Sequence, residues 1–273
     1  MSLSRSALFV PATRVDRIPK ALQSGADCVI VDLEDAVEVN AKDSARADLE
    51  EFAKANPEAR FLVRVNDAKA PWFDADIAMC GRLGNVTGVM LPKAESSRQI
   101  ELAARADKPV YPIVESAVGI ANLAELCRTP GVARVSFGAL DLALDLNMDD
   151  DSPGARALLD HVRCQISIQS RAAGILPPLD GVFPDIANTQ GLAKAVAFAK
   201  GMGYAGVLCI HPSQIAVIHE VFEPTEEEKA WATRVLEMAN ETGLAAFKLD
   251  GKMVDMPVIE KAKQILRIRP VAN

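Results

Sequence analysis

Short apolar runs alternate with longer helical patterns along most of the chain. Each run has the length of a strand and is apolar at nearly every position, which is typical of a strand buried on both faces of a parallel sheet. Helical segments follow these runs, and residues 42–55, for example, are rich in Ala, Glu, Lys and Leu. The eight predicted strands lie within residues 7–10, 28–33, 61–65, 88–91, 110–115, 132–141, 175–180 and 206–210.

This arrangement predicts a (β/α)8 TIM barrel of the α/β class, because eight strands recur at roughly 25 to 35 residues, each followed by a helical pattern. The competing fold is a doubly wound open sheet, which usually has a glycine-rich phosphate loop after its first strand. Pro11-Ala12-Thr13 is no such loop, so the barrel is favoured.

The barrel is predicted to span residues 1–222. Residues 223–273 are predicted to form a C-terminal helical extension, which is not an independent domain. Pro224-Thr225 predicts the start and cap of its first helix at residues 226–240. Residues 251–257 lie beyond the eighth unit and are predicted to form an active-site flap.

Two of the apolar runs end in a carboxylate, at Glu115 and at Asp141. The carboxyl ends of parallel strands share one rim of the sheet, and α/β folds place their chemistry there. Two carboxylates suggest a hard divalent cation, most simply Mg²⁺, which often takes one or two carboxylates and completes its shell with water and substrate oxygens. In the alternative interpretation one acid caps the following helix and the other is solvated.

Arg64 lies near the end of the third predicted strand, close to the same rim. Functionally, it would offer its planar fork to a substrate carboxylate or a developing enolate oxygen. Three acids after the second strand would orient metal-bound water from outside the coordination shell. The alternative is a structural salt-bridge network. The three acids are Asp32, Glu34 and Asp35.

Two further polar residues follow strands but carry weaker signals. Lys93 is better explained as a surface or phosphate-contacting residue than as a Schiff-base former, and a structural role explains His211 at least as well as catalysis. No serine occupies a Gly-x-Ser-x-Gly elbow, so a serine-hydrolase triad is unsupported.

Composition excludes several classes of protein. The chain of 273 residues can bury a large core, and its net charge of −7 gives no support to nucleic-acid binding. No apolar run is long enough to cross a membrane, and the N-terminus lacks the apolar core of a signal peptide. Five dispersed cysteines are typical of reduced residues in a cytoplasmic protein.

Six short motifs occur in an order and spacing that resemble the citrate lyase β-subunit-like proteins. These belong to the HpcH/HpaI aldolase superfamily, together with the malyl-CoA and citramalyl-CoA lyases. The resemblance covers about residues 5–266. The motifs are Leu8-Phe9-Val10-Pro11, Val31-Asp32-Leu33-Glu34-Asp35-Ala36-Val37, Arg64-Val65-Asn66, Ile113-Val114-Glu115-Ser116, Phe137-Gly138-Ala139-Leu140-Asp141-Leu142 and Ile210-His211-Pro212-Ser213-Gln214-Ile215.

This resemblance implies a (β/α)8 barrel that assembles as a homotrimer or hexamer and cleaves a 3-hydroxyacyl thioester with Mg²⁺. Glu115 and Asp141 match the metal ligands of the family, and Arg64 matches its substrate-binding arginine. Glu115 is also expected to contact the substrate through the metal site. Residues that differ from the family pattern leave the metal ligands intact; they are Ala12, Asn147, Asn188 and Val207.

The resemblance also implies where the thioester carrier and a proton-transfer group lie. Arg14, Arg17 and Lys20 lie where such enzymes contact the CoA phosphates. Gly251-Lys252-Met253-Val254-Asp255 fits a motif whose aspartate reaches the active site of a neighbouring subunit. Asp255 is therefore expected to exchange a proton with the acyl-thioester enolate.

The leading functional hypothesis is a Mg²⁺-dependent carbon–carbon lyase. It would cleave or form a small 3-hydroxyacyl-CoA of the malyl, citramalyl or citryl type, yielding a 2-oxo acid and acyl-CoA. Variants use an acyl carrier protein as the thioester carrier or add a hydrolysis step. One alternative is an aldolase of free 2-oxo-acid substrates, which would not need the basic cluster or Asp255. Another is a non-catalytic binding protein, against which the intact Arg64, Glu115 and Asp141 argue.

Overall fold

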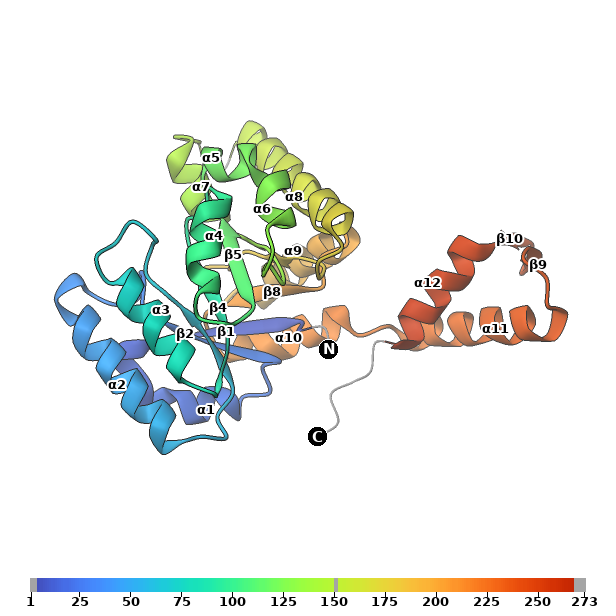
Figure 1. Cartoon of the computed structure of the whole chain (residues 1–273). Helices are drawn as coiled ribbons and strands as arrows, with labels where there is room; N and C mark the ends of the chain where they lie inside the picture. Colours follow the sequence, from blue (N-terminus) through green and yellow to red (C-terminus); the bar gives the residue numbers. More distant parts are fainter. Residues whose placement is uncertain (1–3, 150–151, 268–273) are drawn as a thin grey trace. The chain divides into compact units, whose positions relative to one another are not determined.

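The structure is a computed structural model that describes residues 4–149 and 152–267. Its larger part is a closed barrel of eight parallel strands, in which β8 pairs with β1 (Figure 1). The predicted (β/α)8 barrel is confirmed. The strands are β1 (Ser6–Pro11), β2 (Cys28–Asp32), β3 (Phe61–Arg64), β4 (Val86–Leu91), β5 (Val110–Val114), β6 (Ser136–Phe137), β7 (Leu179–Asp180) and β8 (Gly206–Cys209).

The barrel interior is filled by a layer of apolar side chains, one from each of seven strands. Neighbouring positions face outward against the surrounding helices and are buried as well, as at Val29 and Val31 on either side of Ile30. Burial on both faces explains why the strands are almost continuously apolar. The interior layer consists of Ala7, Ile30, Leu62, Met90, Ile113, Leu179 and Leu208.

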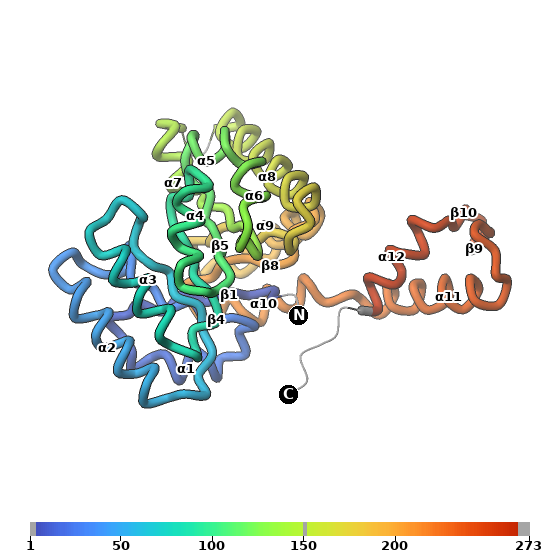
Figure 2. Tube along the Cα trace, viewed as in Figure 1, coloured from blue at the N-terminus to red at the C-terminus, as the bar shows by residue number. Residues whose placement is uncertain are grey.

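Helices follow the strands and surround the barrel, and the trace runs round it in chain order (Figure 2). The helix predicted at residues 42–55 is confirmed as α2. The helices are η1 (Ala12–Arg17), α1 (Ile18–Leu22), η2 (Val39–Ala41), α2 (Lys42–Ala55), α3 (Phe73–Arg82), α4 (Ser97–Ala104), α5 (Ala117–Ala121), α6 (Leu123–Arg128), α7 (Ala139–Asp145), α8 (Pro153–Ala173), α9 (Thr189–Gly201) and α10 (Ser213–Phe222).

Strands β6 and β7 are shorter than predicted, with two residues each. Pro177 and Pro178 lack the N–H groups that a longer ladder would need. The Arg134 guanidinium donates to the carbonyls of both prolines, and the Pro178 carbonyl also accepts from the Ala205 N–H beside β8. Because β6 ends at Phe137, Asp141 lies in the first turn of α7 and not at a strand end, which corrects the expected placement.

The chain divides into two compact units, one ending at His219 and the other beginning at Glu220. The second unit contains α11 (Glu226–Thr242), a hairpin of β9 (Phe247–Leu249) and β10 (Lys252–Val254), and α12 (Met256–Arg267). The helix start predicted at Thr225 is confirmed, since the Thr225 hydroxyl accepts from the Glu228 N–H in a capping box. Whether the extension folds independently stays a prediction.

The hairpin turn lies at the start of residues 251–257, the segment predicted to form a flap. Asp250 and Gly251 have φ of +52° and +77°, as a two-residue turn between antiparallel strands requires. A small core of its own supports this unit, including Ala232, Val235 and Ile259. Within residues 4–149 and 152–267, no helix has the length and apolar character needed to span a bilayer.

Candidate active site

The predicted rim residues meet at the carboxyl ends of the barrel strands. A small cavity of about 70 Å³ lies among them. Arg64 comes from the end of β3, Glu115 follows β5, and Asp141 comes from α7. Apolar side chains form the remaining walls, among them Phe9 and Leu208.

Asp32 and Arg64 form a bidentate pair at the ends of β2 and β3. Arg64 Nε and Nη2 donate to the two Asp32 oxygens at 2.7 and 2.6 Å. Asp32 also accepts from the backbone N–H groups of Glu34 and Ala36, so both of its oxygens are shared between a side-chain and a backbone donor. The Arg64 guanidinium lies 4.8 Å from the centre of the Phe9 ring. Arg64 is therefore held in one orientation, with one edge of its fork used within the protein.

Glu34 lies between two cations. Arg64 Nη1 is 3.1 Å from Glu34 Oε2, and Lys93 Nζ donates to Oε1 at 2.8 Å. Burial raises the pKa of Glu34 above its usual value, although the charge of Arg64 opposes this. Asp35 is more exposed and lies 3.5 Å from Arg64 Nη1. Lys42 donates to the backbone carbonyl of Glu34 at 2.6 Å and so fixes the loop after β2.

Glu115 is buried, with 5% of its surface exposed, and has few partners. Its Oε1 accepts from the Lys93 N–H at 2.8 Å, while Oε2 accepts no hydrogen bond from the described residues. Burial raises the pKa of Glu115 to about 8, and the nearby charge of Asp141 acts in the same direction. A Cβ at Gly138 would collide with Glu115 Oε2, so glycine is needed for this close approach.

Asp141 has no hydrogen bond or ion pair to any residue in the described ranges. Its position in the first turn of α7 favours a negative charge. Glu115 and Asp141 together therefore offer unused carboxylate oxygens in one cavity. Hard oxygen donors in this number suit Mg²⁺, which completes its octahedron with water and substrate. The residues present fit such an ion.

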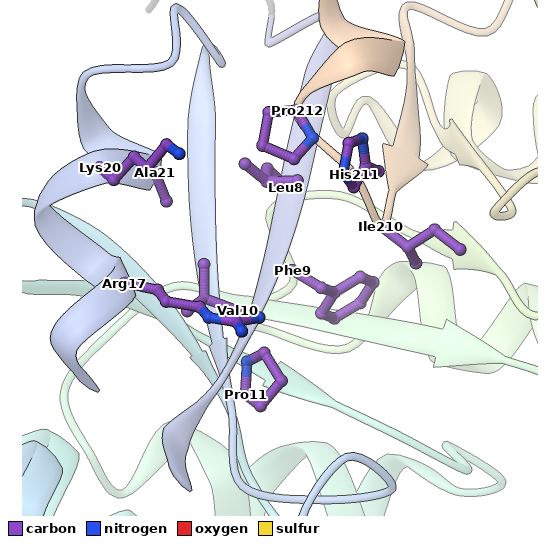
Figure 3. A pocket seen from close by; sticks show the side chains of 10 residues that line it. All are labelled: Leu8, Phe9, Val10, Pro11, Arg17, Lys20, Ala21, Ile210, His211 and Pro212. Atoms are coloured by element: carbon purple, nitrogen blue, oxygen red, sulfur yellow. The ribbon is translucent and has the colours of Figure 1, made fainter. Parts of the chain in front are cut away.

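A second, larger groove of about 330 Å³ lies between β1, α1 and the loop before α10 (Figure 3). Arg17 and Lys20 line one side of it and His211 the other. His211 Nδ1 accepts from the Ser213 N–H at 3.2 Å, so the neutral ring carries its proton on Nε2. Arg14 is not among the lining residues and instead pairs with Asp16 at 2.8 Å.

Comparison with known proteins agrees with this geometry. The model of the HpcH/HpaI aldolase/citrate lyase family matches residues 5–212. The chain belongs to this family. It is 34% identical to the citrate lyase subunit beta-like protein of Deinococcus radiodurans over 97% of both chains. It is 29% identical to the mitochondrial citramalyl-CoA lyase of Rattus norvegicus, over 97% of this chain and 85% of the rat protein.

The solved structures also include close family relatives. The protein CitE of Mycobacterium tuberculosis, in complex with magnesium, acetoacetate and coenzyme A, superposes with a TM-score of 0.86. The two chains are 36% identical, over 97% of this chain and 98% of the other. The family predicted from the six motifs is thereby confirmed.

Asp255, the predicted proton-transfer residue of this HpcH/HpaI family member, lies in the second unit. It follows β10 and accepts from the Val258 N–H at 3.4 Å near the start of α12. This contact is that of a helix cap. Its catalytic role stays a prediction, as do the roles assigned to Arg14, Arg17 and Lys20.

Sequence reasoning missed two contributors to the site. The sequence favours a surface or phosphate-contacting role for Lys93, yet Lys93 contacts both Glu34 and Glu115. Its place directly after a strand, on the same rim as the acids, was the available signal. Gly138 lies within the motif of residues 137–142. The steric reason for a glycine there becomes evident only when Glu115 is placed beside it.

Proposed function

We propose that this HpcH/HpaI family member is a Mg²⁺-dependent carbon–carbon lyase of a small 3-hydroxyacyl-CoA thioester. The acyl group would be of the malyl, citramalyl or citryl type, and the products a 2-oxo acid and acyl-CoA. The observation that carries the proposal is the pair Glu115 and Asp141, two carboxylates with unused oxygens in one cavity beside an oriented arginine. Relatives named as lyases, and one solved with magnesium and coenzyme A, support it.

Glu115 and Asp141 are the residues that would hold Mg²⁺. When bound, the ion supplies Lewis acidity to the oxygens of the substrate. The buried position of Glu115 keeps bulk water away from one side of the cavity. Gly138 leaves the room that the Glu115 carboxylate occupies.

Arg64 would stabilise negative charge that develops on the thioester oxygen as the carbon–carbon bond breaks. Asp32 accepts from Nε and Nη2, and Nη1 lies 3.1 Å from Glu34 Oε2, so Arg64 would share its Nη1 N–H groups between Glu34 and the substrate. Because protein donors already engage both oxygens of Asp32, we assign to it the orientation of Arg64. The earlier hypothesis, that Asp32 orients metal-bound water, is less compatible with these contacts.

The groove with Arg17 and Lys20 would bind the phosphates of the carrier. Two cations and the His211 Nε2–H suit a diphosphate, whereas a free 2-oxo acid would not need them. Asp255 would transfer the proton to or from the acyl carbon, and in a homotrimer or hexamer it would reach the site of a neighbouring subunit. Mixing Asp255→Ala with Glu115→Ala subunits, each inactive alone, would then restore part of the activity.

The proposal is tested with purified protein, Mg²⁺ and a panel of malyl-CoA, citramalyl-CoA and citryl-CoA. Release of the 2-oxo acid and of the acyl-CoA would be measured separately, so that hydrolysis is distinguished from cleavage. We expect turnover of at least one thioester, which EDTA abolishes and added Mg²⁺ restores. Cleavage of free hydroxy acids without any thioester turnover would favour the aldolase alternative. Mg²⁺ binding without turnover of either class would favour a binding protein.

A further inference from the structure

Lys93 contacts acids on both sides of the cavity. It follows β4 by two residues, and its side chain is 39% exposed. Its backbone N–H donates to Glu115, whereas its ammonium group donates to Glu34. Glu115 follows β5 and Glu34 follows β2, so one residue links the two acids across the rim.

The backbone of Lys93 has an unusual conformation. Its φ is +49°, in the left-handed region that residues with a Cβ rarely enter. The Ala94 N–H donates to the Ile113 carbonyl at 3.1 Å, which anchors the loop to β5. Gln99 Nε2 lies 3.4 Å from the Lys93 carbonyl and donates to it. A left-handed lysine that is held from both sides, with its N–H on a buried carboxylate, points to a functional constraint.

The ammonium group of Lys93 and the guanidinium group of Arg64 both lie within ion-pair distance of the Glu34 carboxylate. Lys93 Nζ is 2.8 Å from Glu34 Oε1, while Arg64 Nη1 is 3.1 Å from Oε2. Without Lys93, Arg64 would be the one remaining cation within ion-pair distance of Glu34 among the described residues. Glu34 would then attract Nη1 more strongly and reduce what Arg64 can donate into the cavity.

We propose that Lys93 is a positioning residue with two separate actions. Its backbone N–H fixes one oxygen of Glu115, so that the other oxygen and Asp141 can share a metal ion. Its ammonium group neutralises Glu34, so that the outer N–H groups of Arg64 stay available to the substrate. This inference rests on the proposed function of the same site, and it assigns the two actions to two different measurements.

The backbone action is tested with Lys93→Gly and Lys93→Val. Both variants lack the ammonium group, but glycine enters the left-handed region freely and a β-branched residue does not. We expect Mg²⁺ to bind Lys93→Val about tenfold more weakly than Lys93→Gly, because a hydrogen bond to a carboxylate is lost. Isothermal titration calorimetry measures both affinities, and thermal unfolding checks that both variants are folded. Equal Mg²⁺ affinities in the two folded variants would overturn this action.

The ammonium action is tested with Lys93→Met and its conservative partner Lys93→Arg, at saturating Mg²⁺. We expect Lys93→Met to lower kcat about tenfold, an effect of the size seen when a hydrogen bond to a charged group is removed. Lys93→Arg should recover most of the loss. In a Glu34→Gln background, Lys93→Met should change kcat little, because the charge that it neutralises is gone. An undiminished loss in that background would overturn the link through Glu34.

Mg²⁺ titration of the unmodified protein separates this inference from the proposed function. If the unmodified protein binds no Mg²⁺, the proposed metal site is wrong and the Lys93 variants have no bearing on it. If it binds Mg²⁺ and all four Lys93 variants match it in affinity and in kcat, the metal site stands and the inference about Lys93 is wrong.

Discussion

The two halves of the barrel rim differ in how completely their charged side chains are paired. On the half formed by β2 and β3, every charge has an opposite charge within 4 Å, and Asp32 shares both oxygens between side-chain and backbone donors. On the half formed by β5 and α7, the side chains of Glu115 and Asp141 have one hydrogen-bond donor between them among the described residues, the Lys93 N–H. A cluster whose acids are already paired can position Arg64 but has few carboxylate oxygens left to bind a metal ion. Glu115 and Asp141 still have carboxylate oxygens without a donor among the described residues, and a bound ligand can use these oxygens.

This difference makes the first prediction the largest in effect. Glu115→Gln and Asp141→Asn should each abolish measurable Mg²⁺ binding and lower kcat/KM by about a thousandfold, since the interactions lost are those of a metal site worth several kcal/mol. Neither variant should be much less stable than the unmodified protein, because rim residues serve function more than folding. Calorimetry and steady-state kinetics measure the two effects. If both variants kept the affinity of the unmodified protein, the half formed by β5 and α7 would not be the metal site.

The second prediction tests the half formed by β2 and β3. Asp32→Asn keeps the shape of the side chain but removes the charge that holds Arg64 in the bidentate pair, and should lower the free energy of unfolding by about 3 kcal/mol. Mg²⁺ affinity should fall much less than in Glu115→Gln. Denaturant unfolding gives the first quantity and calorimetry the second.

The matched control for this variant is Asp16→Asn. Asp16 pairs with Arg14 on the exposed surface, and its loss should leave unfolding unchanged. A stability loss in Asp32→Asn no larger than in Asp16→Asn would mean that the half formed by β2 and β3 carries no structural role.

The third prediction uses pH. Burial raises the pKa of Glu115 to about 8 from its ordinary 4.5, so the metal-free folded state binds its proton more tightly than the unfolded state does. The stability that this group contributes is complete below about pH 4.5 and is lost as pH rises towards 8. Mg²⁺ binding must displace the proton, so affinity should rise across the same window and level off above it.

Measurements at several pH values, with Glu115→Gln as the reference, isolate this group from the others that titrate. As pH rises, the free energy of unfolding of the metal-free unmodified protein should fall relative to that of metal-free Glu115→Gln. A difference that does not change between pH 5 and 8 would contradict a protonated Glu115.

The fold and the meeting of the rim acids were predictable because both depend on local patterns. Strands buried on two faces are almost continuously apolar, and their order brings Glu115 and Asp141 to one cavity even though β6 has only two residues. Asp250-Gly251 is likewise a local signal for a two-residue hairpin turn, whereas the role of residues 251–257 as a flap stays a prediction. Asn188, which departs from the family pattern, caps α9, because its Oδ1 accepts from the Gly191 N–H at 2.8 Å. The departure at Val207 has no consequence that the structure explains.

Contacts between different strands were not predictable. Whether Arg64 offers its fork to a substrate or gives it to Asp32 depends on the distance between the ends of β2 and β3, which no local pattern encodes. The left-handed backbone of Lys93 likewise depends on its neighbours on β5, because nothing in the lysine side chain favours a positive φ.

The last prediction extends the comparison to the basic groove and has the smallest effect. Arg14 forms an ion pair with Asp16, whereas Arg17 and Lys20 have no ion pair among the residues that the structure describes. If unused charge marks a binding role here too, Arg17→Ala and Lys20→Ala should each raise KM for a CoA thioester about three- to fivefold, the range of exposed ion pairs. Arg14→Ala is the matched control and should leave KM unchanged. Because the groove is open to solvent, the difference between the variants should shrink at high ionic strength, whereas kcat should be the same in all three. Equal rises in KM for all three variants would show that net charge alone attracts the substrate, and that the pairing of Arg14 has no influence on its role.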